Sequence, residues 1–83
     1  AAYLPARIGQ SITEIDTPAL LLDMSAVERN IARMAAFFAN KPCRPRPHVK
    51  THKLPRIALM QMAAGAIGVT CATLKEAQVM ADS

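Results

Sequence analysis

Short apolar runs alternate with amphipathic segments along most of this chain. The run ALLLD at residues 19–23 is typical of a strand buried on both faces, and AIGVTCA at residues 66–72 has the same character. Between them, the prolines of residues 44–52 argue against a helix. We therefore expect three strands, one from each of these segments.

Three other segments have the apolar spacing of amphipathic helices. The first, residues 25–40, opens with Ser25 and Glu28 at the spacing of a capping box, in which each side chain satisfies an amide at the helix start. Its apolar side chains recur on one face: Val27, Ile31, Met34 and Phe38. This pattern predicts one long helix with a single buried stripe.

The second and third helices are shorter. Residues 54–65 place Pro55 in the first turn and Gly65 just beyond the end, the positions that these residues favour. The third helix begins at Thr73, which forms a second capping box with Glu76. The order strand, helix, strand, helix, strand, helix, with short connections, predicts an α/β protein with a parallel sheet.

The first part of the chain does not follow this alternation. Residues 1–18 lack a clear period and contain Pro5, Gly9 and the Thr17-Pro18 step, which favours extended backbone. We expect residues 1–18 to be an N-terminal arm and residues 19–83 to be the strand-helix units.

Positive charge is concentrated in one part of the chain. The net charge is +4, and six of the ten Lys and Arg residues lie between Lys41 and Arg56, whereas no acid occurs between Glu28 and Glu76. Such asymmetry indicates an anionic partner: a nucleic acid, a membrane surface or a phosphate-bearing ligand. The aromatic residues lie outside this run, so it lacks the stacking platform typical of nucleic-acid binding.

Two other features limit the setting. The longest uncharged stretch, residues 57–74, is interrupted by polar residues and glycines and is a poor membrane span. Cys43 and Cys71 occur without a secretory signal, which favours a reducing, cytoplasmic compartment.

The basic stretch has a regular alternation. If residues 44–52 form a strand, one face carries only cationic or imidazole side chains: Arg44, Arg46, His48, Lys50 and His52. Such a face is costly to bury in an open sheet. It has a purpose in a closed barrel, whose lumen opens at the carboxyl ends of the strands onto an active site.

Lys50 is the candidate catalytic residue of this stretch. Neighbouring positive charges and desolvation both favour its neutral amine, which is a nucleophile toward carbonyl groups. A Schiff-base lysine is one hypothesis, and a solvated lysine on a charged surface is the alternative. His48 and His52 would lie about 13 Å apart on a strand, too far to share one metal ion.

The string RPHVKTHK, together with IDTPALLLDMSAVERNI before it and AAGAIGVTCATLKEAQVMADS after it, resembles the N-terminal part of a known enzyme group. The group comprises D-threonine aldolases and D-serine dehydratases, which belong to the alanine racemase-like, fold type III pyridoxal phosphate enzymes. The resemblance runs from Ile15 to Ser83.

This resemblance implies a TIM-type (β/α)8 barrel of the alanine racemase N-terminal domain type, followed by a C-terminal β domain. A barrel of this kind takes roughly 250 residues, so the 83 residues would form only part of it. We therefore expect a fragment of a longer enzyme, poorly folded and inactive by itself. By position, Lys50 would be the catalytic lysine that binds pyridoxal 5'-phosphate covalently, while the roles of His48 and His52 stay open.

The implied activity is that of a lyase on D-β-hydroxy amino acids, with aldol cleavage of the D-threonine aldolase type placed first. D-serine dehydration, racemisation and non-catalytic binding of pyridoxal phosphate are the alternatives. The resemblance also implies a divalent metal (Mn, Mg or Zn) held by residues outside this chain, a homodimer, and neither a nucleic acid nor a membrane as partner.

Overall fold

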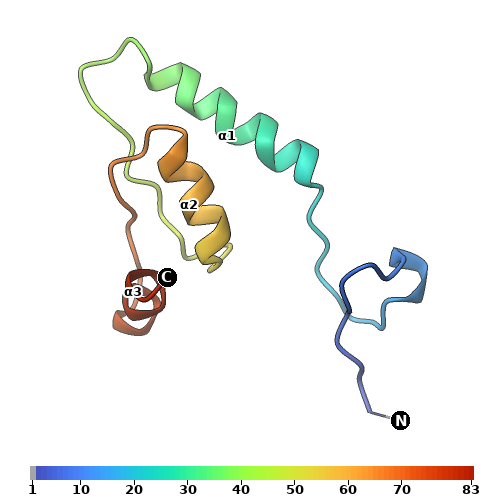
Figure 1. Ribbon diagram of the computed structural model, residues 1–83. Coiled ribbons are helices and arrows are strands. Elements are labelled where there is room, and N and C mark those ends of the chain that lie inside the picture. Colours follow the sequence, from blue (N-terminus) through green and yellow to red (C-terminus); the bar gives the residue numbers. More distant parts are fainter. Residues whose placement is uncertain (1) are drawn as a thin grey trace.

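The computed structural model describes residues 2–83 and is helical in its regular elements (Figure 1). A short 3-10 helix is followed by three α-helices. Their bounds are η1 Ile12–Glu14, α1 Met24–Phe38, α2 Pro55–Ala63 and α3 Leu74–Ala81. All three predicted helices are therefore present.

No regular strand forms within residues 2–83, so the strand predictions are wrong as stated. Two of the three predicted strands nevertheless run parallel beside each other and form an isolated bridge between His48 and Thr70. We call residues 45–49 and 67–70 the paired segments. Helix α2 lies between them in the sequence, so they have the connectivity of a strand-helix-strand unit.

Prolines explain why the paired segments form a single bridge and not a continuous ladder of backbone hydrogen bonds. Three backbone hydrogen bonds join them: Val49 N–H to the Thr70 carbonyl (2.9 Å), Thr70 N–H to the Pro47 carbonyl (2.8 Å), and Ile67 N–H to the Pro45 carbonyl (3.1 Å). Pro45 and Pro47 accept in these bonds but have no N–H to donate. Among the positions that face residues 67–70, only Val49 donates.

The remaining predicted strand, residues 19–23, is extended but unpaired. Its leucines, Leu20, Leu21 and Leu22, are all exposed. The segment lies at the N-terminal end of α1, whereas the paired segments follow the opposite end (Figure 1). Helix α1 has 15 residues and a length of about 22 Å, which separates residues 19–23 from the paired segments.

The start of α1 differs from the predicted capping box. The N-cap is Asp23, whose Oδ1 accepts a hydrogen bond from the Ala26 N–H at 3.2 Å, and Ser25 lies inside the first turn. Aspartate is among the strongest N-cap residues, because its carboxylate satisfies an amide that the helix leaves free. Ser25 and Glu28 therefore do not cap this helix.

The ends of α2 and α3 confirm the sequence patterns. Pro55 occupies the first turn of α2, and Gly65 follows its end with a φ of +120° that L side chains rarely adopt. At α3, Thr73 Oγ1 accepts from the Glu76 N–H at 3.1 Å, and the Glu76 carboxylate accepts from the Ala72 N–H at 3.3 Å. Thr73 therefore caps α3 as predicted. The Glu76 carboxylate reaches one residue beyond the N-cap, to Ala72, where a capping box would bind the Thr73 N–H.

Little of the described chain is buried. The buried apolar residues are Val49, Ile57 and Ala58, at the first paired segment and the start of α2. The radius of gyration is 15.5 Å and the extents are 54 × 30 × 17 Å, whereas a compact domain of this length has a radius of gyration of about 12 Å. Residues 2–83 thus have an extended shape with a very small core.

Candidate functional site

Lys50 directly follows the best-buried residue of the paired segments. Val49 has no exposed surface, and its N–H donates to the Thr70 carbonyl at 2.9 Å. Lys50 itself is exposed. The structure therefore places a free amine at the carboxyl end of a paired segment, where parallel α/β proteins gather their ligand-binding groups.

The chain turns sharply after Val49. The Val49 carbonyl accepts a hydrogen bond from the Lys53 N–H at 2.8 Å, and Lys53 has a φ of 54°, in the left-handed region. Leu54 is then the N-cap of α2. We call residues 50–53 the Lys50 turn. It connects the buried Val49 to the start of α2 within four residues.

His48 holds the backbone of Lys50. Its Nδ1 accepts a hydrogen bond from the Lys50 N–H at 3.1 Å. A ring nitrogen that accepts carries no proton, so in this bond the neutral imidazole of His48 carries its hydrogen on Nε2. The His48 side chain is exposed and holds the Lys50 backbone. Within residues 2–83, it forms no hydrogen bond with the Lys50 amine.

His52 makes a corresponding bond two residues farther on. Its Nδ1 accepts from the Leu54 N–H at 2.9 Å, and its Nε2 lies 3.2 Å from Oε1 of Gln61 on α2. The imidazole is half-buried. His52 therefore connects the Lys50 turn to α2, and it is half-buried whereas Lys50 is exposed.

The predicted alternation of the basic stretch is confirmed up to Lys50. Its basic and imidazole side chains are exposed, and the intervening residues are half-buried or buried: Pro45, Pro47 and Val49. His52 does not share this face, contrary to the prediction for a strand over residues 44–52, because the chain turns after Val49. The desolvation that the sequence argument invoked for Lys50 is not supplied by residues 2–83, since Lys50 is exposed.

The residues of the described chain do not converge on a metal ion. Within residues 2–83, no group of three or more His, Cys, Asp or Glu side chains has a geometry that could hold one. Cys43 and Cys71 are free thiols, exposed and half-buried respectively. In the same part of the chain, no helix has the length and the apolar content needed to span a membrane.

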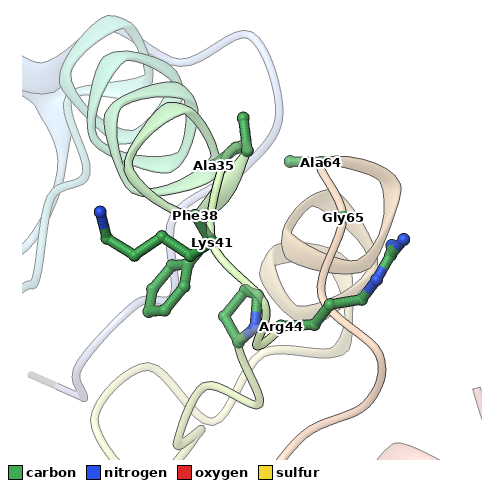
Figure 2. A pocket seen from close by; sticks show the side chains of 8 residues that line it. Ala35, Phe38, Lys41, Arg44, Ala64 and Gly65 are labelled. Atoms are coloured by element: carbon green, nitrogen blue, oxygen red, sulfur yellow. The ribbon is translucent and has the colours of Figure 1, made fainter.

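A hollow of about 250 Å³ lies between the end of α1 and the residues after α2 (Figure 2). Its cationic lining residues are Lys41 and Arg44, whose side chains extend in opposite directions in Figure 2. Lys41 Nζ lies 4.4 Å from the centre of the Phe37 ring, a cation–π contact. The two cations do not converge on one anion, and Lys50 does not line this hollow.

Sequence reasoning missed the role of Gln61. It is the only polar residue in α2 after Arg56, in the sequence IALMQMA. A single amide in an otherwise apolar helix indicates a specific polar partner. The partner, His52, could not be chosen from the sequence, because the hydrogen bond depends on the turn at residues 50–53.

Comparisons with known proteins give relatives of one kind. No family model matches the chain. The chain is 42% identical over 73 residues to a D-threonine aldolase of Arthrobacter sp., covering 88% of this chain and 19% of that protein. It is 47% identical over 68 residues to the D-threo-3-hydroxyaspartate dehydratase of Delftia sp., covering 82% of this chain and 18% of that protein.

A solved structure agrees with these relatives. The crystal structure of D-threonine aldolase from Filomicrobium marinum matches with a TM-score of 0.87 and 52% sequence identity, over 95% of this chain and 21% of that chain. The chain thus spans about a fifth of the length of the proteins it matches. The resemblance noted from the sequence is confirmed.

Proposed function

The chain belongs to the family of the D-threonine aldolases and D-threo-3-hydroxyaspartate dehydratases, and on this premise we propose that it is part of a pyridoxal-phosphate-dependent lyase acting on D-β-hydroxy amino acids. The observation that carries the proposal is the 52% identity, at a TM-score of 0.87, to a D-threonine aldolase over 95% of the chain. Because the chain spans about a fifth of that enzyme, the activity belongs to a longer protein that contains these residues.

Lys50 fits the cofactor by its chemistry. A primary amine is the group with which the aldehyde of pyridoxal phosphate reacts, and the Lys50 amine is exposed. No carboxylate occurs between residues 29 and 75, so no acid close in sequence neutralises it. Bound there, the cofactor supplies an electron sink for a bond broken at the substrate's Cα.

The chain's own contribution is to present this amine. Val49, the residue before Lys50, is held in place by its burial and by its hydrogen bond to Thr70. His48 accepts a hydrogen bond from the Lys50 N–H. Lys50 is therefore both the catalytic and the cofactor-binding residue of the proposal. A backbone fixed on one side leaves the flexible side chain as the main source of motion at the amine.

The paired segments support a proposal about the whole fold. They are parallel and are connected through α2, as neighbouring strands of a (β/α)8 barrel are. We place them as two neighbouring strands of a TIM-type barrel, completed by residues outside this chain. Lys50 then lies at the carboxyl end of its strand, the end at which such barrels carry their active sites.

Aldol cleavage is the reaction we place first. It breaks the Cα–Cβ bond of the substrate and yields glycine and an aldehyde, whereas dehydration removes the β-hydroxyl and yields an oxo acid and ammonia. The match to the solved D-threonine aldolase, at 52% identity over 95% of this chain, supports cleavage. The identities to the Arthrobacter aldolase and the Delftia dehydratase, 42% and 47%, do not separate the two reactions. D-serine dehydration and non-catalytic binding of the cofactor are the alternatives.

A product assay separates these alternatives. The complete enzyme would be given D-threonine, D-threo-3-hydroxyaspartate and D-serine in turn, with the L-isomers as controls. Glycine and acetaldehyde from D-threonine support the aldolase proposal. Ammonia and an oxo acid as the only products would replace it with a dehydratase, and no turnover of any substrate by a cofactor-loaded protein would favour a carrier.

The remaining proposals concern the setting of the enzyme. We place a divalent metal (Mn, Mg or Zn) near the substrate's β-hydroxyl, on ligands outside residues 1–83, and expect a chelator to lower turnover without releasing pyridoxal phosphate. A homodimer and a cytoplasmic location are part of the same proposal. The two free thiols agree with a reducing compartment.

Lys50→Ala tests the cofactor site directly. The complete enzyme is expected to show a visible absorption band with pyridoxal phosphate, and borohydride reduction followed by peptide mapping is expected to find the label on Lys50. The variant Lys50→Ala should lose both the band and the label. Lys53→Ala is the matched control, because Lys53 is a second lysine of the same turn, and it should keep both. A label on another lysine would contradict the assignment.

A further inference from the structure

Of the four residues in the Lys50 turn, only His52 is directed into the protein. Lys50, Thr51 and Lys53 are exposed, whereas His52 is half-buried. Its hydrogen-bond partners are Leu54, at the start of α2, and Gln61, farther along the same helix. Among the side chains of the Lys50 turn, His52 is therefore the one that forms a hydrogen bond to a side chain of α2.

Both ring nitrogens of His52 are used in hydrogen bonds. Nδ1 accepts from the Leu54 N–H at 2.9 Å, and Nε2 lies 3.2 Å from Gln61 Oε1. Leu54 is the N-cap of α2 and provides no side-chain cap of its own, and Pro55 has no N–H. His52 therefore contributes a polar contact at a helix start that otherwise lacks a side-chain cap.

This geometry selects one form of the imidazole. Because Nδ1 accepts a hydrogen bond, it carries no proton, and the neutral ring must carry its hydrogen on Nε2. That hydrogen is then donated to Gln61 Oε1, which is a carbonyl oxygen and an acceptor. A doubly protonated ring would set an N–H against the Leu54 N–H, and a metal ion would have to displace one of the two partners.

These contacts bear on Lys50 because it lies between two fixed points. Val49 is fixed on one side, by full burial and by hydrogen bonds of its N–H and C=O. His52 is fixed on the other, two residues after Lys50. We propose that His52 is a positioning residue, which ties the Lys50 turn to α2 through Gln61 and so sets where the Lys50 amine meets the cofactor. This inference rests on the proposed function of Lys50.

Four variants of the complete enzyme test the inference. His52→Leu removes both hydrogen bonds at similar volume, and Gln61→Leu removes one. His52→Asn keeps an acceptor that can reach the amide two residues on, as asparagine does in turns, but does not reach Gln61. Gln78→Leu is the matched control, because Gln78 is an exposed glutamine of the neighbouring helix α3.

The first readout is the dissociation constant of pyridoxal phosphate from the reloaded apoenzyme. We expect His52→Leu to raise it about tenfold and Gln61→Leu by about threefold, the range expected for losing one or two hydrogen bonds. His52→Asn should lie between wild type and His52→Leu, and Gln78→Leu should match wild type. Where His52→Leu unfolds, Gln61→Leu and His52→Asn carry the comparison.

The second readout does not need the cofactor. Histidine-specific ¹⁵N NMR of the apoenzyme reports which ring nitrogen carries the proton. We expect His52 to be protonated at Nε2 and not at Nδ1, with the Nε2 resonance displaced in Gln61→Leu and unchanged in Gln78→Leu. Protonation at Nδ1 would overturn the inference.

The two proposals fail in different ways. Wild-type enzyme that carries no cofactor on Lys50 overturns the proposed function, and with it the positioning role. Wild-type enzyme that carries the cofactor on Lys50, with His52→Leu and Gln61→Leu binding it equally well, overturns the role of His52 alone.

Discussion

At the scale of single residues, Val49 and Lys50 form an unequal pair of neighbours. Val49 is fully buried and uses both its N–H and its C=O in hydrogen bonds, whereas Lys50 is exposed and presents a flexible side chain. A nucleophilic side chain benefits from a rigid neighbouring backbone, because a fixed backbone restricts the positions that the reactive atom visits. The precision of the proposed site therefore depends on Val49 as much as on Lys50.

Val49→Ala should therefore lower the free energy of unfolding more than the same substitution at an exposed valine does. Removing two buried carbon atoms is expected to cost about 2 kcal/mol, from lost burial and the space left behind. Val79→Ala is the matched control, since Val79 is exposed on α3, and should change stability by less than about 0.5 kcal/mol. Denaturant unfolding of the complete enzyme measures the free energy of unfolding of each variant. Equal losses would show that the burial of Val49 does not stabilise the protein.

The sequence predicted the residue pattern only where it is local. Alternation of side chains from Arg44 to Lys50 follows from extended backbone and is present in the structure. The bond between His52 and Gln61 joins a turn to a helix nine residues apart. It depends on the left-handed conformation of Lys53, which the residue type does not indicate.

At the scale of elements, the helices begin where a side chain caps them. For α1, two candidates lie two residues apart, Asp23 and Ser25, and the structure uses Asp23. The sequence pattern favoured Ser25 because Glu28 follows it at capping-box spacing. Asp23 also ends the apolar run of residues 19–23, so the pattern along the sequence indicates a strand end there and not a helix cap.

A pair of alanine substitutions decides between the two caps. Asp23→Ala should destabilise the start of α1 by about 1 kcal/mol, because the Ala26 N–H loses its acceptor. Ser25→Ala should have little effect, since Ser25 lies inside the helix. Hydrogen exchange at Ala26 measures the loss of the Asp23 cap. A Ser25 cap would instead bind the Glu28 N–H, so faster exchange at Glu28 in Ser25→Ala, with Ala26 unchanged in Asp23→Ala, would restore the capping box.

Strands were harder to predict than helices because their hydrogen bonds lie outside the segment. The segments 44–52 and 66–72 do pair in parallel, but two prolines remove donors on the paired side. The run at 19–23 has the apolar composition of a strand, yet residues 2–83 offer it no partner. Composition identified extended segments, and pairing required information that a single segment does not carry.

At the scale of the whole molecule, the described chain exposes more surface than a compact domain of its mass. Its accessible surface is 6815 Å², against about 4,800 Å² for a compact protein of this size. Within residues 2–83, sixteen large apolar side chains are exposed. They are spread over the whole chain: Tyr3, Leu4, Ile8, Ile12, Leu20, Leu21, Leu22, Met24, Met34, Phe37, Leu54, Leu59, Met62, Ile67, Leu74 and Val79.

The 83 residues expressed alone should consequently be unstable. We expect strong binding of an apolar dye and a broad, weakly cooperative thermal transition by circular dichroism, because three buried residues make too small a core. The complete enzyme is the control and should bind little dye. A sharp transition of the isolated chain, with a radius of gyration of about 12 Å, would show that these residues fold alone.

Without the resemblance, the sequence indicates an α/β class, of which residues 2–83 show one strand-helix-strand connection and no regular strand. The barrel is indicated by the resemblance alone and stays a prediction. Strand-helix alternation indicates a parallel α/β arrangement, which the paired segments and α2 follow. Closure of the proposed barrel would involve strands outside these residues. Neither periodicity nor composition within 83 residues reports on it.

The left-handed backbone of Lys53 has a consequence for engineering. An L side chain other than asparagine or aspartate enters this region at a cost of about 1–2 kcal/mol, and Lys53 does so with a φ of 54°. Asparagine adopts the same conformation more readily. Lys53→Asn would thus stabilise the turn beside Lys50 and leave the proposed cofactor-binding amine in place, so thermal robustness can be added at this position without loss of the cofactor.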